Sequence, residues 1–396
     1  MIGVIADDLT GAAELGAVGL RHRLRSQVLL SGNPDAAAEL VCIDTHSRSC
    51  APQEAGQRSA AGARVLTSNG AKWIYKKVDS VLRGQIAHEL QAVLTELRMN
   101  RALLVPTNPS RGRTIQNGCY FIQGKPIHET EFALDPEYPR TSPRVIDLLS
   151  APPSINVTVC SPLGPFPDTG IIVPEVVSSD DLRALAARQW NNTLLAGAAE
   201  FFGALLVQTG HAPTVPASRA PAPEAREIFV CGSISESSRQ FVRKSREHGT
   251  PIFSLPESAA RLDFDATFLD PIAKQAASAL NKIPRIILNI GLPLIADKTI
   301  SKSLSTHLAH LAQSVLQRIA TPTAVPNSRL PTRNSTHFYV EGGATATELV
   351  QRMDWQRLAV VEEIAPGTAT LSVEADRHLL LTIKPGSYPW PDQVNP

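Results

Sequence analysis

The sequence has little that points to a membrane, a polyanion or a secreted protein. Its net charge is only +1, from 38 Lys and Arg against 37 Asp and Glu. This near-neutral balance disfavours nucleic acid and anionic membranes as partners. No apolar run approaches the roughly 20 residues that a bilayer-spanning helix needs, and the first residues lack the basic and apolar regions of a signal peptide. A cytoplasmic protein is therefore expected.

Cysteine is scarce, and its spacing matches no known framework. The five cysteines include no CxxC pair and no matching histidine spacing, so reduced thiols are favoured over disulfides or a structural zinc. Aromatic residues make up only 5% of the chain, whereas 31 prolines place much of it in loops and turns. No fixed-period repeat is present. The length of 396 residues exceeds what one core usually serves, so two domains are expected.

Strand and helix patterns alternate along both halves of the chain. This alternation predicts α/β domains with mostly parallel, doubly wound sheets. Turn signals at 117–118 and 123–124 predict a β-hairpin inserted in the first half, which could serve as an edge flap or the contact of a homodimer. Helices are predicted over 179–188 and 196–206. The proline-rich stretch 210–223 reads as a linker, giving domains 1–222 and 223–396.

Charged residues follow two of the strands predicted in the first half. Asp7 and Asp8 come directly after the first strand, and Thr10 is a plausible N-cap of the next helix. Carboxyl ends of parallel strands collect polar ligands, although a lone Asp-Asp pair is more often a solvated turn. A second group follows a later strand and suits an anionic carboxylate ligand, with a salt-bridged surface turn as the alternative. This group comprises Lys76, Lys77, Asp79 and Arg83, and a later loop adds Arg113.

Glycine and hydroxyl residues follow three strands of the second half, at 232–235, 342–345 and 384–387. Glycine lets the backbone approach a phosphate, hydroxyls donate, and a helix N-terminus carries about half a positive charge. Each turn alone is more often a plain loop. Three such turns in one domain make a site for nucleotide phosphates as strongly indicated as plain loops. No GxxxxGK[ST] or GxGxxG motif occurs at these turns, which disfavours a P-loop NTPase. An NAD-linked oxidoreductase is disfavoured because Asp-Asp stands where the first glycine fingerprint should be.

Several of these motifs recur together, in this order, in one known family. They are IADDLTGA at 5–12, KKVDSVLRG at 76–84, the PxxPxxGRT loop from 106, GSxS at 232–235 and GGxTA at 342–346. In this combination the chain resembles the four-carbon acid sugar kinases. The resemblance implies an N-terminal domain that binds a sugar acid and a C-terminal domain that binds ATP. It also implies phosphorylation of threonate, erythronate or 3-oxo-tetronate at a terminal hydroxyl.

The resemblance also implies roles for individual residues. Asp7 and Asp8 would face the substrate hydroxyls, and Lys76, Asp79 and Arg83 would surround its carboxylate. The expected ATP site comprises Ser233, Ser235, Gly342, Gly343, Ala344, Thr345 and Gly386.

Phosphoryl transfer needs alignment, charge neutralisation and a proton acceptor. As a mechanistic hypothesis, Arg83 with Lys76 or Lys77 clamps the carboxylate, and Asp8 or Asp79 accepts the hydroxyl proton. Mg²⁺ would bridge the β- and γ-phosphates of ATP, and its protein ligands are not assigned.

Two departures from the family pattern motivate a rival function. Ala344 stands where the family usually has an acidic residue, and 384–390 reads KPGSYPW instead of the usual K-[ST]-G-x-F-G loop. The alternative is a catalytically impaired, kinase-like protein that binds a sugar acid or a nucleotide as a sensor.

Overall fold

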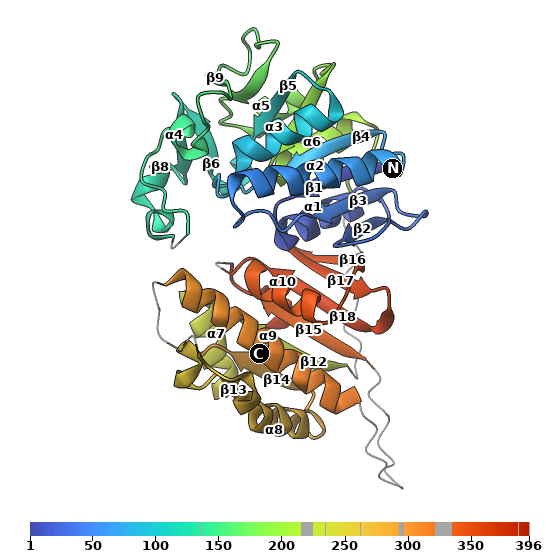
Figure 1. The fold of residues 1–396 in the computed structure, drawn as a ribbon, viewed down its shortest axis with the longest axis vertical. Helices are drawn as coiled ribbons and strands as arrows, with labels where there is room; N and C mark the ends of the chain where they lie inside the picture. The colour runs from blue at the N-terminus through green and yellow to red at the C-terminus, as the bar shows by residue number, and fades with distance from the viewer. Residues whose placement is uncertain are drawn as a thin grey trace. The chain divides into compact units, whose positions relative to one another are not determined.

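The computed structural model describes residues 1–135, 137–214, 225–233, 235–261, 263–292, 297–320, 335–386 and 388–395. Internal packing divides the chain into two compact units, Met1–Pro216 and Ala217–Pro396 (Figure 1). Residues 215–223 of the predicted linker lie outside the described residues, so the exact domain boundary stays a prediction.

The first unit is built on a fully parallel sheet with the order β2-β3-β1-β4-β11-β5-β10-β9. All residues of β1, β2 and β3 are buried, as expected for strands covered by helices on both faces. The strands are β1 (Ile2–Ala6), β2 (Ser26–Leu29), β3 (Leu40–Asp44), β4 (Trp73–Lys77), β5 (Arg101–Val105), β9 (Val157–Cys160), β10 (Gly170–Pro174) and β11 (Thr193–Gly197).

Helices of the first unit pack in two groups. One group pairs α2 with α3, which lie side by side in Figure 1, and in the other α6 packs against both α1 and α5. The helices are α1 (Leu9–Arg21), α2 (Pro52–Ser68), α3 (Ile86–Leu97), α4 (Val145–Leu149), α5 (Ser179–Ala186) and α6 (Ala199–Gln208). Ser178 and Asp181 form a capping box at the start of α5. The predicted cap of α1 is wrong: Asp8, not Thr10, accepts a hydrogen bond from the N–H of Gly11.

The helix predicted over 196–206 is wrong at its start. Residues Thr193–Gly197 form β11, which lies between β4 and β5 in the sheet, and α6 begins only at Ala199. Leu and Ala are good helix formers, but a fully covered central strand position favours any short apolar run. Gly197 ends this strand in close contact with β5, since a Cβ at Gly197 would lie 2.0 Å from the carbonyl oxygen of Val105.

The predicted hairpin insertion is present as a small antiparallel sheet of order β6-β7-β8. Strand β7 (Cys119–Ile122) pairs with β8 (Lys125–Pro126), as expected from the glycine turn between them. Strand β6 (Arg113–Gln116), which the sequence did not indicate, pairs with the other edge of β7. The insertion therefore begins at Arg113, one of the predicted substrate-binding residues.

The second unit has a mixed sheet with the order β13-β14-β12-β15-β18-β17-β16. Strands β13, β14, β12, β15 and β18 pair in parallel with their neighbours in this order. Strands β18, β17 and β16 form an antiparallel meander. The sequence interpretation missed β16 and β17. The strands are β12 (Arg226–Cys231), β13 (Ile252–Ser254), β14 (Arg285–Asn289), β15 (Thr336–Glu341), β16 (Arg357–Ala365), β17 (Thr368–Val373) and β18 (Asp376–Lys384).

Helices of the second unit include one group built around a long helix. Helix α9 packs against α8 and α10 and against strands β12 and β14. Elsewhere Phe241 of α7 packs on Phe229 of β12 and on Trp390. The helices are α7 (Glu236–Glu247), α8 (Asp270–Leu280), α9 (Lys298–Ala320) and α10 (Gly343–Arg352). Across the described ranges of both units, no helix combines the length and the apolar character needed to cross a bilayer.

Candidate functional site

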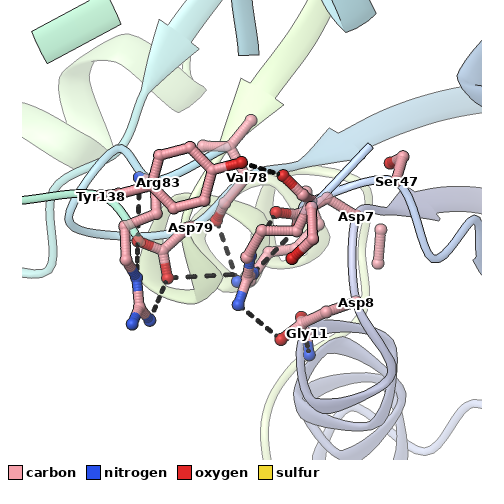
Figure 2. A network of polar contacts seen from close by, with 12 residues as sticks. Asp7, Asp8, Gly11, Ser47, Val78, Asp79, Arg83 and Tyr138 are labelled. Atoms are coloured by element: carbon pink, nitrogen blue, oxygen red, sulfur yellow. Dashed lines mark hydrogen bonds and ion pairs between the residues drawn. The ribbon is translucent and has the colours of Figure 1, made fainter. Parts of the chain in front are cut away.

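Carboxylates and guanidiniums gather at the carboxyl ends of β1, β3 and β4, which are neighbours in the first sheet. Figure 2 shows Asp7, Asp8 and Asp79 turned toward one another. Asp7 and Asp8 follow β1, and Asp79 follows β4. The structure therefore brings the two predicted charged groups of the first half together. This is the behaviour expected of loops at the same edge of a parallel sheet.

Arg48 connects these carboxylates. Its Nε and Nη2 donate to the two carboxylate oxygens of Asp7 at 2.7 and 3.0 Å, and its Nη1 donates to Asp8 Oδ2 at 2.6 Å. Nη2 also lies 3.8 Å from Asp79 Oδ1. The side chain is only 18% exposed. A guanidinium can serve three acidic partners at once because its five N–H donors form a rigid fork.

The loop that carries Arg48 is held by its own backbone and hydroxyls. The N–H groups of Ser47 and Arg48 donate to the carbonyl oxygen of Asp7 at 3.0 and 3.2 Å, and Thr45 Oγ1 donates to the Ala6 carbonyl. Gly84 packs against the Arg48 side chain. It adopts a φ of +91°, and a Cβ on Gly84 would lie 3.4 Å from Arg48 Cγ. Glycine suits this position because other residues rarely adopt that backbone conformation.

The three carboxyl groups differ in acidity because their partners differ. Burial opposes ionisation of Asp7, but Arg48, Lys76 and Lys77 hold its pKa below the usual value. Burial and the charge of Asp7 raise the pKa of Asp8, although Arg48 opposes the rise. Of the two, Asp8 is therefore the better proton acceptor.

Asp79 is held by the loop that it begins. Its carboxylate accepts hydrogen bonds from the N–H groups of Val81 and Arg83 at 3.1 Å each, and from the Arg83 guanidinium at 3.1 and 2.9 Å. Burial opposes ionisation, but Arg83 and Arg48 hold the pKa of Asp79 well below its usual value. A carboxylate so thoroughly bonded is a weak base. These contacts favour a positioning role for Asp79 over the catalytic role predicted from the sequence.

Arg83 is engaged by two carboxylates. Besides Asp79, its Nη1 donates to Asp135 Oδ2 at 3.1 Å. The predicted carboxylate clamp would need Arg83 to share its donors with the substrate. Three of its N–H donors already serve protein acceptors, so the contacts do not favour Arg83 as the main receptor for the substrate anion.

Lys76 and Lys77 pair on opposite sides of β4. Lys76 is fully buried, with its Nζ 3.0 Å from Glu89 of α3, whereas Lys77 Nζ lies 3.2 Å from Glu14 of α1. Successive residues of a strand point to opposite faces, so the two lysines cannot clamp one ligand together. Lys76 and its partner Glu89, which also accepts a hydrogen bond from Ser47, are better suited to support the Arg48 loop.

Arg113 reaches the same loop from the insertion. Its Nη1 donates to the hydroxyl of Ser80, the residue after Asp79, and its guanidinium lies 5.9 Å from the ring of Phe132. Tyr120 of β7 donates to the carbonyl of Ser80. The structure therefore brings Arg113 to the edge of the charged cluster, next to Asp79.

Sequence reasoning missed Arg48, Asp44 and Asp135. A signal existed for the first two, because Asp44 to Arg48 follow β3, the strand next to β1. Burial raises the pKa of Asp44 to about 7, although the N–H of His46 favours the carboxylate. Asp135 lies in an irregular segment after the insertion, where no periodic pattern indicated it.

The predicted nucleotide-binding residues of the second unit also come together. Ser233 and Ser235 follow β12, and both hydroxyls donate to the carbonyl oxygen of Gly386 at 2.9 Å. Ser235 also caps α7 by accepting from the N–H of Ser238. Gly386 follows β18, and a Cβ on it would lie 3.1 Å from Ser233 Oγ and 3.7 Å from Gly342 Cα. Two of the three predicted turns therefore touch directly.

The third turn begins α10. Gly342 adopts a φ of +88°, donates its N–H to the Lys384 carbonyl, and is followed by Gly343 as the first helical residue. Ala344 is exposed, whereas Thr345 is buried. Thr345 lies so close to Gly232 that a Cβ on Gly232 would be 2.0 Å from Thr345 Oγ1. The start of α10 therefore presents backbone N–H groups beside the Gly386 loop, an arrangement suited to phosphate.

The unusual 384–390 segment is anchored by a buried ion pair and an aromatic cluster. Lys384 Nζ lies 3.0 Å from Glu341 and donates to the Tyr388 carbonyl at 2.6 Å. The ring of Trp390 packs on Phe229 and Tyr339 and lies 5.0 Å from Lys384 Nζ. These contacts hold Lys384 and Trp390, on either side of the Gly386 turn, against β12 and β15.

Within the part of the chain that the structure describes, no group of three or more His, Cys, Asp or Glu side chains is arranged to hold a metal ion. Among the described residues of the three turns, the side-chain oxygen groups are the hydroxyls of Ser233, Ser235 and Thr345. Mg²⁺ prefers oxygen ligands, and in nucleotide sites it keeps several waters and binds phosphate oxygens. This donor set fits a magnesium ion that is held chiefly by a nucleotide.

Two family models match the chain. Residues 2–162 match a sugar-binding N-terminal domain, and residues 228–388 match a nucleotide-binding C-terminal domain. The charged cluster lies within the residues that match the sugar-binding domain, and the glycine turns lie within those that match the nucleotide-binding domain.

Two relatives align along nearly the whole chain, and a third aligns along part of it. The chain is 27% identical to a D-threonate kinase of Salmonella typhimurium over 92% of this chain and 89% of the relative. It is 25% identical to a 3-oxo-tetronate kinase of Cupriavidus necator over 99% and 95%, respectively. A D-erythronate kinase of Heliobacterium modesticaldum is 32% identical over 37% of this chain and 35% of that enzyme.

Solved structures show the same fold. A Haemophilus influenzae protein superposes with a TM-score of 0.69 at 20% identity, covering 97% of this chain and 96% of its own. A Salmonella typhimurium LT2 protein superposes with a TM-score of 0.76 at 19% identity, covering 98% and 96%. With both domain models matched in order and kinase relatives aligned along the full length, the chain belongs to the family of four-carbon acid sugar kinases.

Proposed function

We propose that this protein is an ATP-dependent kinase that phosphorylates the terminal hydroxyl of a four-carbon sugar acid of the threonate, erythronate or 3-oxo-tetronate type. The observation that carries the proposal is the cluster of Asp7, Asp8, Arg48, Asp79 and Arg83 in the unit that matches a sugar-binding domain. Relatives that act on three such acids support the substrate class.

Asp8 is the proposed proton acceptor. Its raised pKa and its place at the start of α1 suit a carboxylate that binds the attacking hydroxyl and removes its proton as the new bond forms. Asp7, with a lowered pKa, stays ionised and keeps Arg48 in place. General base catalysis of this kind supplies about 10²- to 10⁴-fold in rate, and the rest comes from alignment and charge neutralisation.

The turns of the second unit are the proposed ATP site. The N-terminus of α10 would face the phosphates, Ser233 and Ser235 would hold the Gly386 turn beside it, and Gly386 would let the backbone approach them. Mg²⁺, when bound with the nucleotide, neutralises charge on the transferred phosphoryl group. Ala344 contributes no carboxylate, so the metal would be held by phosphate oxygens and water.

One assay separates a kinase from a sensor. Purified protein with ATP and Mg²⁺ is incubated with each stereoisomer of threonate, erythronate and 3-oxo-tetronate, and ADP release is followed by a coupled enzyme assay. We expect rapid ADP release with at least one acid and none without an acid. Saturable binding of an acid by calorimetry, with no ADP release for any member of the panel, would instead establish the sensor.

The Gly386 turn gives a more local test. Gly386→Val places a branched side chain against Ser233 and Gly342, so the turn must move away from the phosphates. We expect the KM for ATP to rise by about tenfold or more, with the KM for the acid unchanged. Ser278→Val, at an exposed position of α8, is the matched control. An equal rise in both KM values for Gly386→Val would contradict this placement of ATP.

A further inference from the structure

We propose that Arg113 and Arg140 together form the receptor for the carboxylate of the acid substrate. This inference rests on the proposed kinase function and names the part of the site that selects an acid over an uncharged sugar. It assigns a specificity role to Arg140, which no sequence motif indicated. The pair of arginines takes the place of the predicted clamp, which consisted of Arg83 together with Lys76 or Lys77.

The other cations of the cluster already have carboxylate partners. Arg48 serves Asp7 and Asp8, Arg83 serves Asp79 and Asp135, and the two lysines pair with Glu89 and Glu14; the distances of these pairs run from 2.6 to 3.2 Å. A substrate carboxylate would have to compete with each of these internal ion pairs. Recognition of an anion is more favourable at a guanidinium without a carboxylate partner.

Arg140 is such a guanidinium. It is only 6% exposed, yet its hydrogen-bond partners are neutral: Nε donates to the Tyr138 carbonyl at 2.7 Å and Nη1 to the Leu82 carbonyl at 3.0 Å. Among the described residues, no carboxylate oxygen lies within 4.0 Å of its nitrogens. Burial lowers the pKa of Arg140 and outweighs Asp79 and Asp135, which attract this cation from beyond contact distance. A bound anion would give the guanidinium the direct charged partner that it lacks.

Arg113 has the same character. Its guanidinium bonds the neutral hydroxyl of Ser80 and lies near the ring of Phe132. Within the described ranges, no carboxylate oxygen lies within 4.0 Å of its nitrogens either. Both arginines therefore offer donors that no protein anion occupies.

The two side chains converge on one short loop. Arg113 holds Ser80 and Arg140 holds Leu82, which are two residues apart in the loop between Asp79 and Arg83. Both arginines also touch Phe132, because the backbone N–H of Arg140 donates to its carbonyl at 2.9 Å. Leu82 adopts a φ of +62°, uncommon for a leucine, and the Arg140 contact supports this conformation.

This loop also links the two arginines to the proposed proton acceptor. Its first residue, Asp79, lies 3.8 Å from Arg48, which in turn bonds Asp8. In the proposed complex, a small hydroxy acid meets guanidinium donors at one end and carboxylate acceptors at the other. The planar fork of arginine matches a carboxylate with two parallel hydrogen bonds, so a pair of arginines gives both charge and orientation.

The test compares an acid with its primary amide, which keeps the carbon chain but carries no charge. Kinetics are measured for wild type, Arg140→Met, Arg113→Met and Arg144→Met; Arg144 is an exposed arginine four residues after Arg140 and serves as the control. For each receptor variant we expect the KM for the acid to rise about 10- to 100-fold. The KM values for the amide and for ATP should stay within about twofold. The preference for the acid over the amide should therefore disappear.

A purely structural role gives a different pattern. If Arg140 and Arg113 only brace the loop, their replacement weakens the acid and the amide alike, and that result would overturn the inference. Arg140→Lys keeps the charge without the fork and should recover part of the acid preference if Arg140→Met does not fold. Wild type that releases no ADP with any acid would defeat the proposed kinase function. Calorimetric binding of the acid to the same variants would still test the receptor.

Discussion

Asp8→Asn is expected to lower kcat by about 10²- to 10⁴-fold while the protein stays folded. Asn caps a helix as well as Asp does, so its side chain can still accept the N–H of Gly11 and α1 should begin at the same residue. What the variant loses is the basic carboxylate. The measurement is steady-state ADP release with the best acid of the panel, together with thermal unfolding to establish that the fold is intact.

The pH profile identifies Asp8 more sharply than the rate alone. A general base must be deprotonated, so wild-type kcat should fall as the pH drops through the raised pKa of Asp8. The residual activity of Asp8→Asn should lack this acidic limb. Asp44→Asn is the matched control, because Asp44 is also buried with a pKa of about 7, and an Asn there can still accept the His46 N–H. Its kcat should stay within about tenfold of wild type. A larger loss for Asp44→Asn than for Asp8→Asn would move the base to Asp44.

The grouping of charged residues was predictable, and their pairing was not. Asp7, Asp8, Asp79 and Arg83 follow strands of one parallel sheet, and such strand ends meet at one edge whatever the details. Which guanidinium meets which carboxylate depends on loop conformation. Arg48 reaches Asp7, Asp8 and Asp79 only because the Thr45–Arg48 loop folds back onto β1, which requires long-range contacts that no local pattern encodes.

The placement of Lys76 and Lys77 on opposite faces of β4 could have been predicted from the sequence. Alternation along a strand places neighbouring side chains on opposite faces, so the sequence already contained the reason why the two cannot share one ligand. Their partners Glu89 and Glu14 lie on helices from opposite layers, which only the fold reveals.

The fold was predictable where periodicity and turn signals agreed. The hairpin and most strands lie where expected, because apolar runs end at glycine or charged turns. Strand β11 was not predicted. Its last two residues, 196–197, were assigned to the following helix because Ala favours a helix locally, whereas their central place in the sheet makes them part of a strand. The meander of β16 and β17 had a turn signal at Pro366 and Gly367 that the interpretation did not use.

Arg48→Met is expected to destabilise the first unit by about 3–5 kcal/mol at neutral pH. The replacement keeps an unbranched side chain of similar length but leaves Asp7 and Asp8 buried without their main counter-ion. Arg48→Lys restores a charge without the fork that spans both partners, so an intermediate loss is expected. Urea unfolding followed by circular dichroism measures the effect. Arg64→Met, which removes an exposed pair with Glu96, should leave the midpoint unchanged.

The pH dependence of the stability lost in Arg48→Met shows whether Arg48 stabilises the unit through its charge. In wild type the lowered pKa of Asp7 contributes stability that is present above the unfolded value near 3.8 and is lost as pH falls through the lower folded value. Without Arg48, burial should raise the pKa of Asp7, so the folded variant binds more protons than the unfolded chain between that raised value and 3.8. Stability of the variant then falls as pH rises, and the gap to wild type should widen from pH 4 to pH 7. Asp44 titrates in both proteins, so its contribution largely cancels in the difference between their free energies of unfolding. A gap that stays constant over this range would mean that Arg48 stabilises the unit by packing and not by charge, because protonation of Asp7 and Asp8 would then leave the loss unchanged.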